Sequence, residues 1–343
     1  MIFTKILYAP NIHQGGGRTL LLPLLESLEN TDGILFVLDE RLILPASWKP
    51  VGTLLIVHPG FFSRLNVEFQ LRKLFTATSH ALCMGNLPPL MAEGGKTTVF
   101  IQNCYLIDQL PLTGFPSLVR ARIMMERWWL RFRAGSIDRF IVQTNSMALR
   151  LKKHLSRNAD IIPFFQLPEV ADSSVAIEKT QYDYLYVASG EPHKNHKVLI
   201  QAWVDLAKIG QFPSLCLTLD RHKFFELYDW IRMKTDQYDL HIKFKYDLSQ
   251  NEVTQLYGKA RALIYPSLFE SFGLPLIEAA HAGLPVLAAD LDYVHDVIIA
   301  SATFDPNSPQ DIASAVSKFT YNPASIPKPM STPDQFLLSV FKK

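Results

Sequence analysis

Short apolar runs alternate with amphipathic stretches along the whole chain, a pattern that predicts parallel strands joined by helices. The first series of expected strands covers residues 5–8, 33–38, 53–57, 81–84, 98–102 and 139–143. The second series covers residues 184–188, 214–219, 241–244, 261–265 and 285–288, with helices expected at 196–208, 224–234, 250–259, 276–282 and 311–318. The pattern therefore predicts an α/β protein.

The two series of strands are separated by a stretch without clear periodicity, which contains prolines and a polar run and is typical of a linker. We expect an N-terminal domain, a linker and a C-terminal domain at residues 1–165, 166–180 and 181–325. In the remaining segment, 326–343, Thr332 followed by Pro333 is typical of a helix start. This last helix either crosses back over both domains or packs on the second domain alone.

Composition agrees with two globular domains and narrows the range of partners. A chain of 343 residues, with 48% hydrophobic and 19% charged residues, is long enough for two cores. A net charge of +2 gives no support to nucleic-acid binding. The three cysteines, Cys83, Cys104 and Cys216, are widely spaced in the sequence. We expect them to be reduced thiols in the core of a cytosolic protein rather than a disulfide framework or a metal site. No apolar run approaches the ~20 residues that span a bilayer, and the N-terminus is unlike a signal peptide, so we expect a cytoplasmic protein that is soluble or peripherally attached.

Two carboxylates, Glu270 and Glu278, flank the start of a predicted helix that follows the strand at 261–265. A loop at the carboxyl end of a parallel strand is where open α/β sheets bind ligands. Backbone N–H groups at the helix start can receive a phosphate, and carboxylates accept hydrogen bonds from hydroxyls. The arrangement suits a ligand that is rich in hydroxyls and carries phosphate, such as a nucleotide sugar.

Two further strand ends carry candidate chemistry. Gly190 and Lys194 follow the strand at 184–188, and a lysine is a point charge suited to a diphosphate. Three glycines, Gly15 to Gly17, follow the first strand, where they would let the backbone approach an anion. A dinucleotide-binding loop is the rival interpretation: its glycine spacing is absent, but Asp39 at the end of the next strand keeps it open.

The run from Glu270 to Glu278 resembles the Glu-x7-Glu signature of retaining glycosyltransferases with the GT-B fold, of the family 4 (group 1) type that builds bacterial surface polysaccharides. Tyr265-Pro266-Ser267 before the run and Ala282-Gly283-Leu284-Pro285-Val286 after it make the match specific. The resemblance implies two facing Rossmann-like domains with a cleft between them. It implies transfer of a hexose from a nucleotide-sugar donor, with retention, to a hydroxyl of a lipid-linked or oligosaccharide acceptor. No cofactor and no metal ion is implied, since the nucleotide sugar is a substrate.

The resemblance also assigns roles to residues. Glu270 contacts the transferred sugar, Glu278 binds the ribose hydroxyls, and Lys194 contacts the donor phosphates. The residues expected to line the donor site through their backbone are Gly16, Gly17, Gly190, Phe272, Gly273 and Leu274. Asn103 stands where the family often has a histidine near the transferred sugar, and His58 competes with it for that place. Many relatives have an arginine upstream of Lys194, which is missing here. Neutralisation of the donor phosphates would then depend on Lys194, on backbone N–H groups and on Arg18.

The stretch 120–133 contains five arginines and two tryptophans in 14 residues. A basic helix with interfacial aromatic residues can lie on an anionic membrane surface, here the inner face of the cell membrane. The alternative is a core-packed helix whose arginines form its solvated face. Single-stranded nucleic acid could use the same residue types, but nothing else in the sequence supports it.

Three other functions share the same parts. Inverting GT-B enzymes and sugar-nucleotide epimerases have the same architecture, and a catalytically degenerate member could act as a partner subunit. The presence of Glu270, Glu278 and Lys194 argues against degeneracy, while the missing arginine and histidine keep it open.

Overall fold

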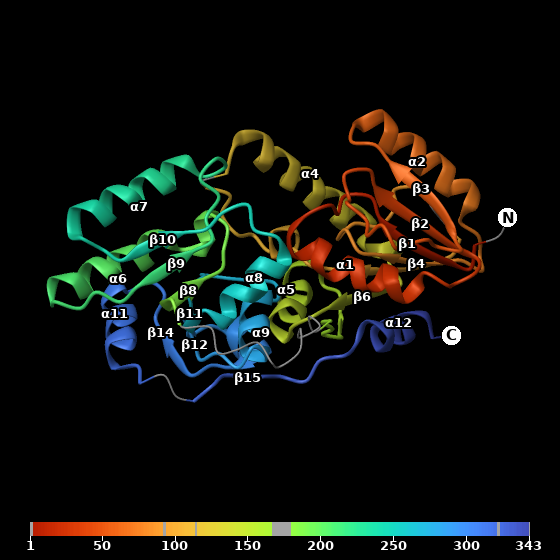
Figure 1. The fold of residues 1–343 in the computed structure, drawn as a ribbon. Coiled ribbons are helices and arrows are strands. Elements are labelled where there is room, and N and C mark those ends of the chain that lie inside the picture. The colour runs from red at the N-terminus through yellow and green to blue at the C-terminus, as the bar shows by residue number, and fades with distance from the viewer. Residues whose placement is uncertain (1–2, 92–93, 114, 167–179, 321–322, 343) are drawn as a thin grey trace. The chain divides into compact units, whose positions relative to one another are not determined.

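The computed structural model describes residues 3–91, 94–113, 115–166, 180–320 and 323–342 (Figure 1). The chain divides into two compact units, one formed by Met1–Gln166 with Met330–Lys343 and the other by Leu167–Pro329. The expected linker at 166–180 falls almost wholly outside the described residues. No helix in the described part of the chain is long and apolar enough to cross a bilayer.

The first unit is built on a seven-stranded parallel sheet in the order β3-β2-β1-β4-β5-β6-β7. Its strands are β1 (Lys5–Ala9), β2 (Ile34–Asp39), β3 (Thr53–Val57), β4 (His80–Cys83), β5 (Lys96–Phe100), β6 (Arg139–Val142) and β7 (Asp160–Ile161). Its connecting helices are α1 (Gly15–Leu28), α2 (Phe61–Leu74), α3 (Cys104–Ile107), α4 (Ser117–Arg133) and α5 (Asn145–Leu155). Every residue of β2 is buried, as expected of a central parallel strand covered on both faces.

The last helix, α12 (Pro333–Phe341), belongs to this first unit. A capping box between Thr332 and Gln335 starts it. Phe336 is fully buried, and its ring stacks on that of Phe164 with ring centroids 4.2 Å apart. Arg139 of β6 donates a hydrogen bond to the carbonyl of Ser339 at 2.7 Å. The chain therefore returns to the first unit after completing the second.

The second unit is built on a six-stranded parallel sheet in the order β10-β9-β8-β11-β12-β14. Its strands are β8 (Tyr182–Tyr186), β9 (Leu215–Leu217), β10 (Ile242–Phe244), β11 (Ala260–Tyr265), β12 (Val286–Ala289) and β14 (Ala302–Phe304), beside a small antiparallel pair, β13 (Ile298–Ile299) with β15 (Ile326–Pro327). Its helices are α6 (His196–Lys208), α7 (Phe225–Tyr238), α8 (Gln250–Gly258), α9 (Leu274–His281), α10 (Asp292–Val297) and α11 (Pro309–Lys318).

The order of strands reverses between β8 and β11, which are hydrogen-bonded neighbours. Such a reversal separates the loops that leave the two strands, and ligands of α/β sheets bind in the crevice that results. The loops after β8 and β11 carry the predicted Lys194 and Glu270, so the topology places both residues beside this crevice. The three cysteines are buried and form no disulfide, as the sequence predicted.

Candidate active site

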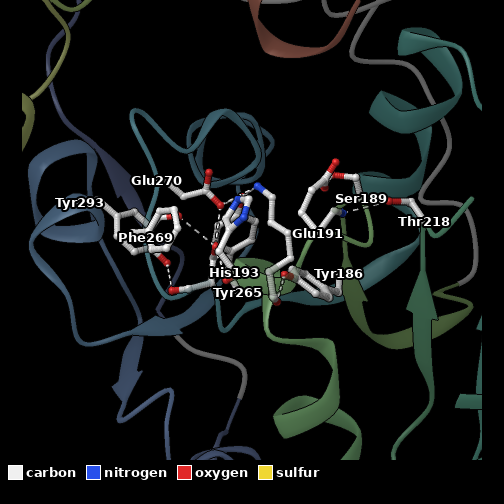
Figure 2. Close-up of polar contacts among 12 residues, drawn as sticks. Tyr186, Ser189, Glu191, His193, Thr218, Tyr265, Phe269, Glu270 and Tyr293 are labelled. Carbon is white, nitrogen blue, oxygen red and sulfur yellow. Dashed lines mark hydrogen bonds and ion pairs between the residues drawn. The ribbon is translucent and has the colours of Figure 1, made fainter. Parts of the chain in front are cut away.

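Lys194 and Glu270 form an ion pair at the carboxyl edge of the second sheet. The Lys194 Nζ lies 2.6 Å from Glu270 Oε1, and the two side chains are only 15% and 12% exposed. Lys194 reaches this place because the short helical turn Pro192–Lys194 follows β8, while Glu270 follows β11. Figure 2 shows Glu270 beside polar and aromatic side chains that include His193, Tyr265 and Tyr293. The sequence predicted both residues but not that they would contact each other.

Two hydroxyls complete the surroundings of Glu270. The hydroxyls of Tyr265 and Ser267 donate hydrogen bonds of 3.0 and 2.7 Å to the same oxygen, Oε1, that Lys194 contacts. In Figure 2 the second carboxylate oxygen of Glu270 points away from this group. Burial raises the pKa of the carboxyl, but the charge and hydrogen bond of Lys194 and the hydrogen bond of Ser267 outweigh burial and hold the pKa below its usual value. Glu270 is therefore ionised at neutral pH.

Hydrogen bonds to backbone carbonyls hold the loops that carry Lys194 and Glu270 in place. The N–H of Leu268 donates to the carbonyl of His193 at 2.8 Å, and Tyr293 donates to the carbonyl of Ser267 at 2.7 Å. Asn195, in the left-handed conformation with φ 61°, donates to the carbonyl of Pro266 at 3.2 Å. These contacts fix the geometry of the ion pair before any ligand arrives, which is the arrangement that electrostatic catalysis requires.

Glu278 lies in a different environment on α9. It is 8% exposed, and its two oxygens accept hydrogen bonds from Tyr257 at 2.7 Å and from Gln250 at 3.1 Å, both on α8. No salt bridge to Glu278 is found within the described ranges. Burial raises the pKa of Glu278 above its usual value, although the two hydrogen bonds act in the opposite direction.

The start of α9 follows the predicted pattern. Gly273, with φ +77°, is the residue before the helix, and Leu274 is its first residue. Phe272 is 6% exposed, so its side chain packs inside. Gly190 has a packing reason of its own, because a Cβ there would lie 2.4 Å from the ring of Phe224.

The candidates of the first unit have local structural roles. Gly16 and Gly17 lie within the first turn of α1, so the expected glycine loop is shorter than predicted, and the helix already begins at Gly15. Asn103 caps α3, since its side-chain oxygen accepts from the N–H of Tyr105 at 3.0 Å. The oxygen of Asn86 in turn accepts from the N–H of Asn103 at 2.9 Å. His58 instead faces solvent, where its ring lies 2.8 Å from Glu40.

Asp39 is the acidic residue that kept a dinucleotide-binding loop open as the rival interpretation. Asp39, at the end of β2, is 3% exposed and accepts two hydrogen bonds from the guanidinium of Arg41, at 2.9 and 2.7 Å. Burial raises the pKa of Asp39, but the bonds from Arg41 lower it by more. The negative charge of Asp39 is therefore balanced by Arg41, which lies two residues further along the chain. Within the described part of the chain, no group of three His, Cys, Asp or Glu side chains is placed to hold a metal ion.

Several residues of the site were not predicted. Tyr257 and Gln250 contact Glu278, and Tyr293 holds the loop of Glu270, yet none of them lies in the motif that drew attention to the site. Tyr265 and Ser267 do lie beside that motif. Their hydroxyl groups, close in sequence to Glu270, were the signal from which hydrogen bonds to its carboxylate could have been predicted.

Comparison with known proteins found a family model and curated relatives that match part of this chain. The model of the glycosyl transferases group 1 family matches residues 169–331. The serotype-specific mannosyltransferase WbdA of Escherichia coli is 28% identical over 202 residues, which cover 53% of this chain and 23% of WbdA. The O-antigen chain mannosyltransferase RfbU of Salmonella typhimurium is 30% identical over 155 residues, covering 43% of this chain and 41% of RfbU. The chain thus spans less than half the length of these curated relatives.

The fold has a close match among solved structures. HepE of Anabaena, in its complex with UDP-glucose, superposes with a TM-score of 0.65 at 14% identity, covering 91% of this chain and 88% of HepE. At that identity the likeness shows the fold alone. Together with the two parallel α/β sheets it confirms the predicted GT-B class.

Proposed function

We propose that the protein, whose residues 169–331 match the model of the group 1 glycosyltransferases, moves a hexose from a nucleotide-sugar donor to a hydroxyl acceptor with retention of configuration. The observation that carries the proposal is the buried ion pair of Lys194 and Glu270, held at the strand-order reversal of the second sheet. A cation and a carboxylate fixed side by side can serve the two halves of a nucleotide sugar, its diphosphate and its hydroxyl-bearing ring.

Lys194 would serve the diphosphate. An ammonium group has three N–H donors, and two partners of Nζ within the protein are Glu270 at 2.6 Å and the Tyr265 hydroxyl at 3.4 Å. One donor is then left for a phosphate oxygen. The start of α9 adds partial positive charge, and the N–H of Leu274 can face a phosphate, whereas Pro275 has no N–H and that of Leu276 donates to the carbonyl of Gly273 at 2.9 Å. Fixed donors of this kind stabilise the charge that grows on the leaving diphosphate, and on this basis we propose a reaction without a metal ion or cofactor.

The glutamates would serve the sugar and the nucleoside. Because three donors already occupy Oε1 of Glu270, its other oxygen would accept from a hydroxyl of the transferred sugar. Each carboxylate oxygen has two lone pairs, so Glu278 could accept from the ribose hydroxyls while Tyr257 and Gln250 hold it. Excluding water from such a site would prevent hydrolysis of the donor.

The acceptor follows from the relatives. WbdA and RfbU are named as mannosyltransferases, RfbU for the O-antigen chain, and HepE was solved with UDP-glucose. These names support a hexose donor and an acceptor that belongs to surface polysaccharide, and we propose a sugar or lipid-linked intermediate as that acceptor. We propose that the protein meets this acceptor at the inner face of the cell membrane.

The test is a panel of nucleotide sugars screened by thermal shift, followed by a transfer assay with the stabilising donor. A donor at about 100 times its Kd should add ~2.7 kcal/mol to the free energy of unfolding. The anomeric configuration of the product, read by NMR, tests retention, and an inverted product would overturn it. Activity that survives a chelator tests the absence of a metal requirement. Lys208→Ala is the matched control for variants of Lys194, since Lys208 is a 56% exposed lysine of the same unit. Failure of every nucleotide sugar to stabilise the protein would overturn the proposal.

A further inference from the structure

Helix α4 presents large apolar side chains to solvent along one face. Leu118, Met124, Met125, Trp128 and Phe132 are 84%, 62%, 58%, 63% and 67% exposed. At 3.6 residues per turn, these positions fall on one side of the helix, and we call them the exposed stripe. The rings of Trp128 and Phe132 stack on each other with an interplanar angle of 9°. Contiguous exposed apolar side chains mark interaction surfaces, whereas scattered single ones do not.

A different face, which runs from beside the exposed stripe to the opposite side, fastens α4 to the first unit. Ile123, Trp129 and Leu130 are buried, and the guanidinium of Arg64 on α2 lies 5.8 Å from the centre of the Trp129 ring. Arg127 donates to the carbonyl of Tyr105 at 2.6 Å. This corrects the sequence analysis, which treated both tryptophans and all the arginines as one surface, because adjacent residues of a helix point about 100° apart.

Arginines border the exposed stripe on both sides. Arg120 and Arg131 are exposed along one edge, and Arg122 is exposed along the other. The one acidic residue in the sequence of α4, Glu126, turns inward with 19% of its side chain exposed, and its burial raises the pKa of its carboxyl. The outward surface of α4 therefore combines apolar and positively charged side chains and carries no acidic side chain of its own.

We propose that the exposed stripe is a membrane-docking surface, which enters the interfacial region of a bilayer while its bordering arginines contact anionic lipid headgroups. Aromatic rings favour this region, and basic side chains near an anionic surface are attracted to it. A second copy of this chain fits the surface less well. Two such helices packed stripe to stripe would bring basic edges together with no acid from either helix to compensate. The docking is independent of sugar transfer and would hold for a protein without that activity.

The experiment is flotation of the whole protein with vesicles of phosphatidylcholine alone or mixed with phosphatidylglycerol, at low and moderate salt. The double variant Trp128→Ser, Phe132→Ser should partition on the order of tenfold to a hundredfold less at either salt concentration, because apolar burial is not screened. The variant Arg120→Gln, Arg131→Gln should lose on the order of tenfold on anionic vesicles at low salt, and less as salt rises. Leu149→Ser is the matched control, since Leu149 of α5 is 58% exposed in the same unit, and it should bind like the wild type.

Three outcomes would overturn the proposal. Wild-type protein that stays with the free fraction at low salt would exclude docking. Full binding by the Trp128, Phe132 variant would show a purely electrostatic attraction without insertion. A wild-type dimer in sedimentation equilibrium that the same variant abolishes would assign the exposed stripe to a second copy. Unchanged circular dichroism and thermal unfolding of each variant would show that α4 still folds, so that lost binding reports the surface itself.

Discussion

The loop that carries Glu270 and the helix that carries Glu278 hold the same residue type in opposite electrostatic settings. Glu270 shares one oxygen with the cation Lys194 and two hydroxyls, and its pKa is lowered. Glu278 is held by a hydroxyl and an amide, both neutral, and its pKa is raised by burial. The two residues belong to one sequence motif, and the motif alone does not show that their electrostatic surroundings differ.

This difference indicates that the negative charges of Glu270 and Glu278 contribute to the site in different ways. At Glu270 the negative charge already holds Lys194 in place, so this residue acts as part of a pair. At Glu278 the charge has no cation to balance it within the described residues, so a bound ligand that donates hydrogen bonds would change its energy more. The predictions below are ordered by the size of the expected effect, and each tests one side of this contrast.

The largest effect is expected from breaking the pair. Lys194→Ala leaves the carboxylate of Glu270 buried without its cation, which should cost about 3–5 kcal/mol of unfolding free energy in urea titration. Lys208→Ala, which removes an exposed pair with Asp205, should cost less than about 1 kcal/mol. In a double-mutant cycle with Glu270→Gln the two losses should not add, because each variant removes the same interaction. Simple additivity would show that the pair is not coupled as its geometry indicates.

Next in size is the effect of Glu278→Gln on the donor. The amide keeps one hydroxyl contact but loses a charge-assisted hydrogen bond, so donor affinity in calorimetric titration should fall by roughly 1.5–3 kcal/mol. The same titration with the free nucleoside should show the same loss, since the proposed contact is with ribose. Donor affinity equal to that of the wild type would remove Glu278 from the site.

A smaller effect is expected from Tyr257→Phe, which removes the 2.7 Å hydrogen bond to Glu278 and nothing else of similar strength. Donor affinity should fall by about 1 kcal/mol. Because that bond favours the ionised carboxylate, its loss should raise the pKa of Glu278 further and move the acid limb of donor binding to higher pH. A purely structural role would lower affinity equally at every pH.

The smallest effect is a pair of opposite pH dependences. The lowered pKa of Glu270 contributes stability above its unfolded pKa of about 4.3, and this contribution is lost as pH falls through the folded pKa. The raised pKa of Glu278 contributes stability below its unfolded value, and this contribution is lost as pH rises toward the folded pKa. Relative to the wild type, Glu270→Gln should therefore lose stability between acid and neutral pH, while Glu278→Gln should gain it. Chemical unfolding at several pH values measures both, and slopes of the same sign would contradict the contrast.

Much of the fold could be predicted because it depends on local periodicity. The apolar runs located the long strands of both sheets within a few residues, and the placement of Lys194 and Glu270 after strand ends, with Glu278 on the following helix, came from them. The helix expected from residue 276 begins at Leu274, because glycine with positive φ can precede a helix directly. The three glycines were expected in a loop, but the first turn of a helix needs no internal partners for its N–H groups, and glycine is tolerated there.

The contacts within the site could not be predicted, because they join segments far apart in the chain. Lys194 and Glu270 are 76 positions apart, and Gln250 precedes Glu278 by 28. Neither spacing has a periodic signal, since both depend on which strands become neighbours and on how side chains turn. The faces of α4 could not be predicted for a related reason: the sequence showed which residues a helix would contain but not which of its faces the first unit would cover.

The return of α12 to the first unit has a consequence for how the protein is made. Because residues 330–343 complete the first unit, the second unit is in effect an insertion within it. Phe336 can fill its place beside Phe100 and Phe164 only after the segment 330–343 has left the ribosome. The second unit is continuous in sequence and can finish folding on the emerging chain, whereas the first, although synthesised earlier, closes its core last. Pulse-chase proteolysis of nascent chains arrested at residue 329 should find the first unit cleaved sooner than in the full chain.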